Sequence, residues 1–268
     1  MEAGIVFDLD PTIFRFGPFQ LRYYGIIFVV MLYLGYFAWR SQILRGGYRE
    51  EIAQNFLLWG VLGVVIGARL GHVLFYDPGY YLSNPLQILV LWRGGLASHG
   101  AAVALVAVLA LYARHYRASV LDIFDRFAFS AAIGAAMVRL GNFFNSEIVG
   151  RPTDLPWGVR FMRYDGGAVA RHPSQLYEFL MGVTILVILI IVDRKSGREQ
   201  RPVGLLSGAF LALYFLARFL VEFVKEFQAL SDSALTMGQY LSIVPFVIGM
   251  GLVGHALKRR VPANNVTP

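Results

Sequence analysis

The stretch that decides the fold reads FAFSAAIGAAMVRLGNFFNSEIVG and covers residues 127–150. Its first half is almost wholly apolar, and similar apolar runs recur along the chain. Of the 268 residues, 57% are hydrophobic and only 15% are charged, whereas soluble domains carry about a quarter charged residues. Runs of about 18 or more apolar residues are long enough to cross a bilayer. The sequence therefore predicts an all-α, polytopic integral membrane protein.

The apolar runs predict about seven transmembrane helices in a single integral membrane domain, residues 1–268. Glycines at 94, 95 and 100 interrupt the third run. Because non-helical backbone at membrane depth must be satisfied by protein or by a wet cavity, we expect a broken or re-entrant segment near 93–100. The connection at about 145–174 is expected to form a small exoplasmic domain. The expected spans are residues 21–40, 52–76, 86–114, 118–144, 175–192, 203–224 and 237–257.

Lysine and arginine are distributed unevenly between the connections that join these spans. Twelve lie in the first, third and fifth connections and the C-terminal tail, against seven in the other connections and the N-terminal segment. Positively charged loops favour the cytoplasmic side, so we expect the N-terminus outside and the C-terminus in the cytoplasm. Membrane topology thus accounts for the formal net charge of +7, and no nucleic-acid partner is expected.

The sequence lacks the residue patterns of the common cofactor and metal sites. It contains no cysteine, which excludes disulfides, thiolate metal ligands and a cysteine nucleophile within the chain. No spacing of histidines and carboxylates is typical of a metal site, and no glycine-rich loop follows a strand to hold a nucleotide. We therefore expect the protein to use neither a metal nor another cofactor.

Five arginines fall inside or at the edge of the expected spans. Each costs about 2.5–3.5 kcal/mol at a helix centre on insertion scales. Five unpaired ones would together cost more than the net stability of a typical fold. They must therefore be paired, close to an interface or in a wet cavity. These residues are Arg69, Arg93, Arg126, Arg139 and Arg218.

The polar half of the opening stretch predicts a binding site. Arg139, Asn142 and Asn145 are three residues apart, and Ser146 follows Asn142 by four. If the helix continues through them, these side chains share one face. A guanidinium fork beside amide donors suits a phosphate or a carboxylate. The alternative is a polar seam between helices, with Arg139 paired to Glu147 or another carboxylate.

Three further patterns carry candidate functional groups. His99 follows the predicted break and is either a general base or a packing residue bonded to another helix. Tyr214, Arg218 and Glu222 are four residues apart, so they form one stripe in which Glu222 neutralises Arg218. This stripe is either structural or part of a substrate site. Tyr24 heads the first span and fits an aromatic belt or a site role.

Two other polar groups are expected to be structural. Arg69 and His72 are three residues apart near a helix end, which is typical of a satisfied polar patch. Asp122, Asp125 and Arg126 lie close together at the cytoplasmic start of the fourth span and are expected to form local ion pairs.

Five motifs, in order along nearly the whole chain, resemble one known family. They are LRYYG (21–25), RGGLASHG (93–100), RLGNFFNSEIVGR (139–151), HPSQLYE (172–178) and RFLVEF (218–223). The third is highly specific, while each of the others would be weak alone. On these motifs the chain resembles the bacterial prolipoprotein diacylglyceryl transferases.

The resemblance implies a bacterial inner-membrane enzyme with seven spans. It implies transfer of the sn-1,2-diacylglyceryl group from phosphatidylglycerol to the lipobox cysteine of a prolipoprotein signal peptide. Glycerol phosphate is released in this first step of lipoprotein maturation. The nucleophile would be the partner's thiol, which accounts for an enzyme without cysteine.

The resemblance also assigns roles residue by residue. Arg139 and Arg218 would stabilise the charge that builds on the departing phosphate. Whether His99 or Tyr214 takes the thiol proton stays open. The implied catalytic residues are His99, Tyr214 and Arg218, and the implied substrate-binding residues are Arg139, Tyr24, Asn142, Asn145, Glu147, Gly150 and Glu222.

A membrane transporter or channel for an anionic solute is the alternative function, because the same intramembrane arginines would suit it. Transporters often contain a repeated half with paired broken helices. The sequence shows neither feature, so the transferase is preferred.

Overall fold

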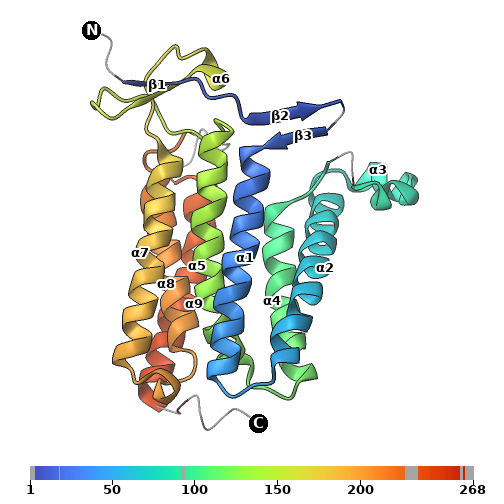
Figure 1. Ribbon diagram of the computed structural model, residues 1–268, viewed down its shortest axis with the longest axis vertical. Coiled ribbons are helices and arrows are strands. Elements are labelled where there is room, and N and C mark those ends of the chain that lie inside the picture. The colour runs from blue at the N-terminus through green and yellow to red at the C-terminus, as the bar shows by residue number, and fades with distance from the viewer. Residues whose placement is uncertain (1–3, 18, 92–93, 227–234, 260–261, 263–268) are drawn as a thin grey trace. The chain divides into compact units, whose positions relative to one another are not determined.

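The computed structural model describes residues 4–17, 19–91, 94–226, 235–259 and 262, and this part of the chain is mainly helical (Figure 1). Five helices are long and apolar enough to cross a membrane. Two shorter apolar helices, His99–His115 within α4 and α8, accompany them. The prediction of a mainly helical, multi-pass membrane protein is confirmed. The helices are α1 (Tyr23–Arg45), α2 (Glu50–Phe75), α4 (Ser98–His115), α5 (Val120–Phe144), α7 (Ser174–Lys195), α8 (Leu205–Val221) and α9 (Met237–Arg259).

Short elements fill the connections, and four of them are strands that the sequence analysis did not predict. β1 (Ile5–Phe7) pairs in parallel with β4 (Val159–Phe161), and β2 (Thr12–Phe16) pairs antiparallel with β3 (Phe19–Arg22). Strands of three to five residues are too short to show a clear alternating pattern in the sequence. The remaining elements are α3 (Pro78–Ser83), η1 (Pro85–Leu89), α6 (Met162–Asp165) and η3 (Arg198–Gln200).

The chain forms two compact units. The larger unit comprises the residues up to Trp39 together with Asp125–Pro262, and the smaller unit comprises Arg40–Phe124. In the larger unit α8 packs against α7 and α9, and Figure 1 shows β1, α6 and the β2–β3 hairpin at one end of its helices. Its buried core joins α5, α7 and α8 through Ala128, Phe129, Ala132, Ile185, Leu189 and Leu206.

Glycines set the close packing of α2 against α4 in the smaller unit. Gly63, Gly67 and Gly71 are four residues apart, so they form one stripe on α2. A Cβ atom on Gly67 would overlap Ala104, and one on Gly71 would lie 2.7 Å from the Cα of Gly100. Small residues of this kind allow close backbone approach between helices in membranes.

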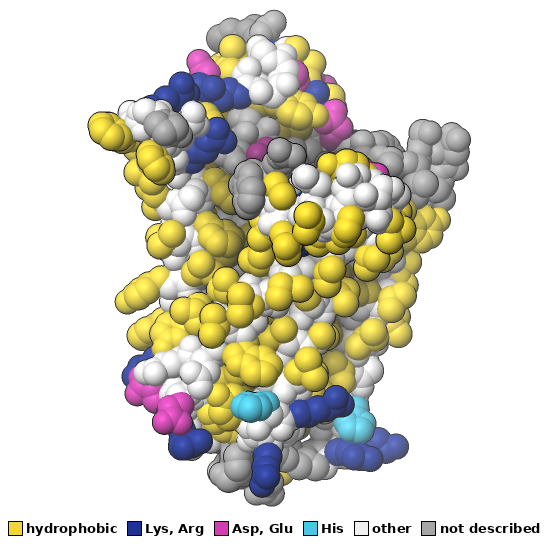
Figure 2. All heavy atoms as spheres, turned by 90° about the vertical axis from the view of Figure 1, so that its right-hand side faces the viewer, with side chains coloured by type: hydrophobic (Ala, Val, Ile, Leu, Met, Phe, Trp, Pro, Cys, Tyr) yellow, Lys and Arg dark blue, Asp and Glu magenta, His cyan; other side chains and the backbone are white. Residues whose placement is uncertain are grey.

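Apolar side chains cover the outer faces of the helices. Figure 2 shows one face on which hydrophobic side chains predominate, while charged side chains gather near the helix ends. On α2, Leu58 and Leu74 are 64% and 63% exposed. An exposed leucine surface of this extent is expected where lipid chains, rather than water, surround the helix.

Candidate functional site

The turn after α5 gathers the polar residues of the opening stretch. α5 ends at Phe144, where the expected span ended, and Ser146 has a positive φ of 55°, so the condition that the helix continue through Asn145 and Ser146 is not met. The turn instead brings Glu147 back to the helix, where it accepts hydrogen bonds from Asn142 Nδ2 (3.3 Å) and Asn145 Nδ2 (3.2 Å). The predicted cluster therefore exists, but it is built by a turn and a carboxylate.

Arg139 pairs with a carboxylate that the sequence analysis did not single out. Its Nε lies 2.7 Å from Oε2 of Glu178 on α7, and its Nη1 donates to Asn142 Oδ1 at 3.4 Å. Among the described residues, Nη2 has no hydrogen-bond partner. The guanidinium is thus held at Nε and Nη1, and Nη2 keeps N–H donors that could bind an oxyanion.

A series of ion pairs with alternating charges, called the charge chain below, connects Arg139 to Arg218 through Glu178, Lys225 and Glu222. The other oxygen of Glu178 lies 2.9 Å from Nζ of Lys225, and Lys225 lies 3.4 Å from Glu222. Glu222 in turn lies 3.8 Å from Nη2 of Arg218, so the predicted pairing of these two residues is confirmed. The sequence analysis did not single out Lys225 as a site residue. Its spacing, seven residues after Arg218 and three after Glu222, could have indicated that it joins this network.

The carboxylate of Glu222, which follows α8 in the sequence, also contacts the N-terminal end of α9. The hydroxyl of Thr236 donates to its Oε2 at 3.1 Å. A Cβ on Gly238 would overlap the Glu222 carboxylate. A carboxylate is stabilised at a helix N-terminus by the helix dipole, so α9 helps to fix the charge chain.

Tyr214 lies on α8 one turn before Arg218 but belongs to a more apolar region. Its ring stacks on Phe210 with centroids 5.6 Å apart and packs against the buried core of the larger unit. No polar contact joins Tyr214 to Arg218 in the part of the chain that the structure describes. The predicted stripe is therefore apolar at its Tyr214 end and charged at its Glu222 end.

Tyr24 and Gly150 pack tightly against the polar cluster. The Tyr24 ring lies on α5 at Gly141, where an added Cβ would be 2.8 Å from the ring. A Cβ on Gly150 would lie 2.5 Å from the carbonyl oxygen of His172 and 2.7 Å from that of Val224. Gly150 thus allows three backbone segments to meet beside the charge chain.

The HPSQLYE segment supplies more of the site than predicted. Ser174 Oγ donates to the Ile148 carbonyl at 3.0 Å, and the fully buried Gln175 donates to the Glu147 carbonyl at 2.7 Å. Together with Glu178, these side chains hold the turn and Arg139. The presence of three polar residues, Ser174, Gln175 and Glu178, in the first turns of an otherwise apolar helix could have indicated this role.

His172, just before α7, has a pKa lowered by burial. Its Nδ1 lies 3.3 Å from the Tyr177 hydroxyl, which accepts from Trp157 Nε1 at 2.8 Å. Because the unfolded chain binds a proton at His172 more readily, stability should fall as the pH drops below about 6.5. We expect wild type to lose more thermal stability than His172→Gln between pH 7.5 and pH 5. Equal losses in both proteins would contradict this assignment.

The charged side chains at the start of α5 also bind partners that are distant in the sequence, which their spacing did not indicate. Asp122 accepts from the Tyr48 hydroxyl at 2.8 Å. Asp125 accepts from the backbone N–H groups of Gly204 and Ser207, both at 2.8 Å, and so holds the start of α8. Arg126 lies 2.6 Å from Glu199. Such charges serve the fold, since a buried charge without a partner is costly.

His99 lies in the first turn of α4 in the smaller unit and is exposed. Its ring stacks on Tyr76 and meets Phe75 edge-on, with centroids 5.8 and 5.4 Å away. Arg93, which the sequence analysis named, lies outside the described residues. Gly94 and Gly95 have positive φ, and the helix begins only at Ser98.

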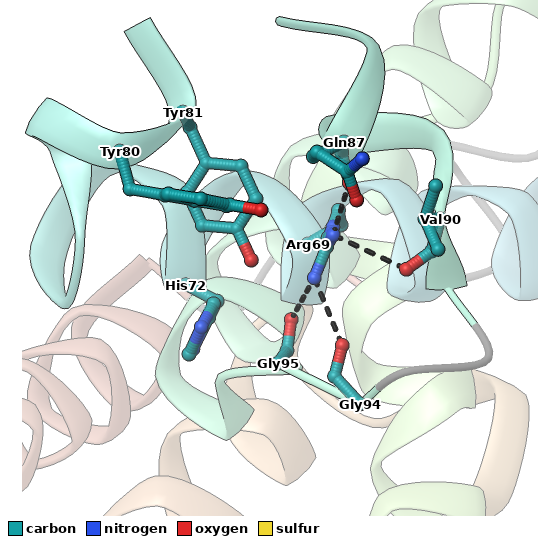
Figure 3. A pocket seen from close by; sticks show the side chains of 8 residues that line it. All are labelled: Arg69, His72, Tyr80, Tyr81, Gln87, Val90, Gly94 and Gly95. Carbon is teal, nitrogen blue, oxygen red and sulfur yellow. Dashed lines mark hydrogen bonds between the residues drawn. The ribbon is translucent and has the colours of Figure 1, made fainter. Parts of the chain in front are cut away.

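A pocket adjoins this region and is lined by residues of α2, α3 and the segment before α4 (Figure 3). The expected satisfied patch of Arg69 and His72 forms one side of it, and Tyr80 and Tyr81 form another. The Arg69 guanidinium lies 4.9 Å from the centre of the Tyr81 ring.

Comparison with known proteins gives a consistent result. A family model described as prolipoprotein diacylglyceryl transferase matches residues 11–254. A protein of Cupriavidus metallidurans is 41% identical over 261 residues, covering 94% of this chain and 95% of its own. One of Porphyromonas gingivalis is 39% identical over 281 residues, covering 97% and 98%. Both are named phosphatidylglycerol–prolipoprotein diacylglyceryl transferase.

Proposed function

This chain belongs to the prolipoprotein diacylglyceryl transferase family, and on that basis we propose that it transfers a diacylglyceryl group from phosphatidylglycerol to the lipobox cysteine of a prolipoprotein. The observation that carries the proposal is the similarity over nearly the whole of both chains. The multi-pass helical fold fits an enzyme whose lipid donor comes from the bilayer.

The chemistry assigns separate tasks to the substrate thiol and the chain. The partner's cysteine, with a pKa of about 8.5 when free, loses its proton and attacks the glyceryl carbon bonded to the phosphate oxygen. A C–S bond forms, the C–O bond breaks, and glycerol phosphate leaves with the bonding electrons. His99 or Tyr214 receives the thiol proton. The charge on the departing phosphate needs preorganised donors.

Arg139 and Arg218 are the proposed phosphate donors. Among the residues that the structure describes, Arg139 is held at Nε and retains a donor without a partner, and Arg218 has only the long contact to Glu222. The substrate headgroup at Arg139 would be oriented by Asn142, Asn145 and Glu147. The Tyr24 ring packs against α5 at Gly141, two residues after Arg139. Glu222 would hold Arg218, and Gly150 would let the backbone approach.

For topology, we propose that α4 and α8 cross the membrane with the five longer helices, which gives seven spans. The segment near 93–100 would enter the membrane without a helix. The unequal distribution of lysine and arginine supports an N-terminus outside, a C-terminus in the cytoplasm of a bacterial inner membrane, and an exoplasmic segment at 145–174. Residues 1–268 would form one membrane domain.

The absence of cysteine allows a direct test of this topology. In intact cells, a membrane-impermeant maleimide is expected to label Asp154→Cys and to leave Arg198→Cys unlabelled until the membrane is opened. Both substituted side chains are exposed or partly exposed. The reverse labelling pattern would overturn the proposed orientation.

The activity is tested by incubating purified protein with phosphatidylglycerol vesicles, with and without a lipobox peptide. We expect glycerol phosphate release that depends on the peptide, together with diacylglyceryl transfer to its thiol. A matched peptide with serine in place of cysteine should give no product. If wild type binds the peptide but releases nothing, the transferase is excluded. The comparisons give no support to the anion-transporter alternative, which uptake into proteoliposomes would reveal.

A further inference from the structure

Arg69 on α2 uses its whole guanidinium to bind one stretch of backbone. Its Nε donates to the Ile88 carbonyl at 2.9 Å. Nη1 donates to Gly94 and Gly95 at 2.9 and 3.0 Å, and Nη2 donates to Gln87 and Val90 at 2.5 and 3.3 Å. A guanidinium has five N–H donors, so every donor is used; Figure 3 draws the bonds from Nη1 and Nη2. Arg69, only 5% exposed, is therefore not an anion-binding arginine.

The stretch that Arg69 binds has a backbone conformation that leaves carbonyl groups without helical partners. Gly94 and Gly95 have φ values of +84° and +75°. A Cβ on Gly95 would lie 2.6 Å from Nη1 of Arg69 and 2.8 Å from the His72 ring. The bound carbonyls come from non-helical backbone or a short 3-10 turn. Within a membrane protein such groups need a partner from the chain or from water.

The same stretch leads directly into the helix that carries His99. Ala97 N–H donates to the carbonyl of Ala68, the residue before Arg69, at 2.9 Å. α4 begins at Ser98 without a side-chain cap at Ala97. The start of the helix is thus fixed by the stretch before it and by α2.

Aromatic contacts with residues at the C-terminal end of α2 hold the His99 ring in place. Tyr76 stacks on both His99 and His72, with centroid distances of 5.8 and 5.2 Å. His72 lies one turn after Arg69 on the same helix, and Gly95 packs on both. A shift of the backbone that Arg69 binds would therefore displace the first turn of α4, which carries His99, relative to Tyr76.

We propose that Arg69 is a positioning residue of the transferase, which acts through His99 by fixing the backbone at residues 87–90 and 94–95 and the start of α4. Arg69 itself touches no substrate. The inference rests on the proposed function and on His99 as the group that receives the thiol proton. A positioned proton acceptor contributes about 10²–10⁴-fold to the rate of a reaction, so its displacement should be costly.

The test is a double-mutant cycle on full-length protein in phosphatidylglycerol vesicles, with peptide-dependent glycerol phosphate release as the readout. Arg69→Ala and His99→Gln should each lower kcat by roughly 10²-fold with little change in KM for the lipid. If Arg69 acts through His99, the double variant is no slower than His99→Gln. Multiplying effects would overturn the proposal, because Arg69 would then support activity independently. Arg49→Ala, an exposed arginine of the same unit, is the matched control.

Chemical rescue guards against a simple folding defect. Low guanidinium chloride should restore activity to Arg69→Ala, while the same concentration of sodium chloride should not. Hydrogen exchange of the first-turn amides of α4 should quicken in the variant and slow again with guanidinium. Arg69→Lys has only three donors and should remain impaired. Wild type without transfer activity would refute the proposed function itself, whereas active wild type with no guanidinium rescue would refute only the role of Arg69.

Discussion

Replacing Arg139 by alanine is expected to lower diacylglyceryl transfer by about 10²–10³-fold, the usual cost of removing one preorganised donor to a developing oxyanion. The variant loses the guanidinium whose Nη2 is free to bind an oxyanion. Arg139→Lys keeps the charge but not the fork, so it should recover only a small part of the rate. Peptide-dependent glycerol phosphate release measures both effects.

The control for Arg139→Ala addresses the partner left behind. Removing one member of a buried ion pair costs about 3–5 kcal/mol when the other charge stays unpaired. Glu178 keeps its contact with Lys225 at 2.9 Å, so the fold should survive. The double variant Arg139→Ala/Glu178→Gln also removes the carboxylate that Arg139 had neutralised, and it should be stable but equally inactive. A double variant that regains activity would show that Arg139 serves only to neutralise Glu178.

Gly150→Val is expected to destabilise the protein and abolish transfer together. Its added Cβ would meet backbone oxygens of His172 and Val224 at 2.5 and 2.7 Å, and backbone cannot rotate away as a side chain can. Overpacking of this kind costs about 1–3 kcal/mol or more. Thermal unfolding in detergent and transfer activity should both report the loss.

Gly134→Val provides a matched control for this substitution. Gly134 lies within α5, and no atom lies within 4 Å of an ideal Cβ there. The same change of residue should therefore alter the stability only by the small difference in helix propensity, which favours valine. If the two valine variants unfold at the same temperature, the close backbone contact at Gly150 does not stabilise the site.

The helices could be predicted from sequence because their signal is local. Long apolar runs located each of the main helices to within a few residues, except near residue 86. There the expected span began at 86, but α4 begins only at Ser98. The glycines at 94 and 95 indicated the break. The pairing of β1 with β4 and the two compact units depend on contacts between distant segments, which one sequence without relatives does not reveal.

The site was predictable as a set of motifs but not as a network. Spacing placed Arg218 beside Glu222 correctly, since helical neighbours are fixed by geometry. The partner of Arg139 could not be found in the same way, because Glu178 lies 39 positions later on another helix. Spacing likewise gave no sign that Asp125 binds the start of α8 or that Arg126 pairs with Glu199. Polar groups in a helical membrane protein also pair across helices, and spacing along one helix does not indicate those partners.

The charge chain from Arg139 to Arg218 has a consequence for biosynthesis. Its members come from α5, α7, the end of α8 and the residues just beyond it, and Thr236 before α9 completes it. While the chain is being made, Arg139 and Glu178 enter the membrane before Lys225 and Glu222 have been synthesised. Unpaired charges at membrane depth are costly. The residues from Arg218 to Lys225 therefore complete the ion pairs of the earlier helices, and a nascent chain that stops short of them would lack the finished charge chain of the proposed lipid site.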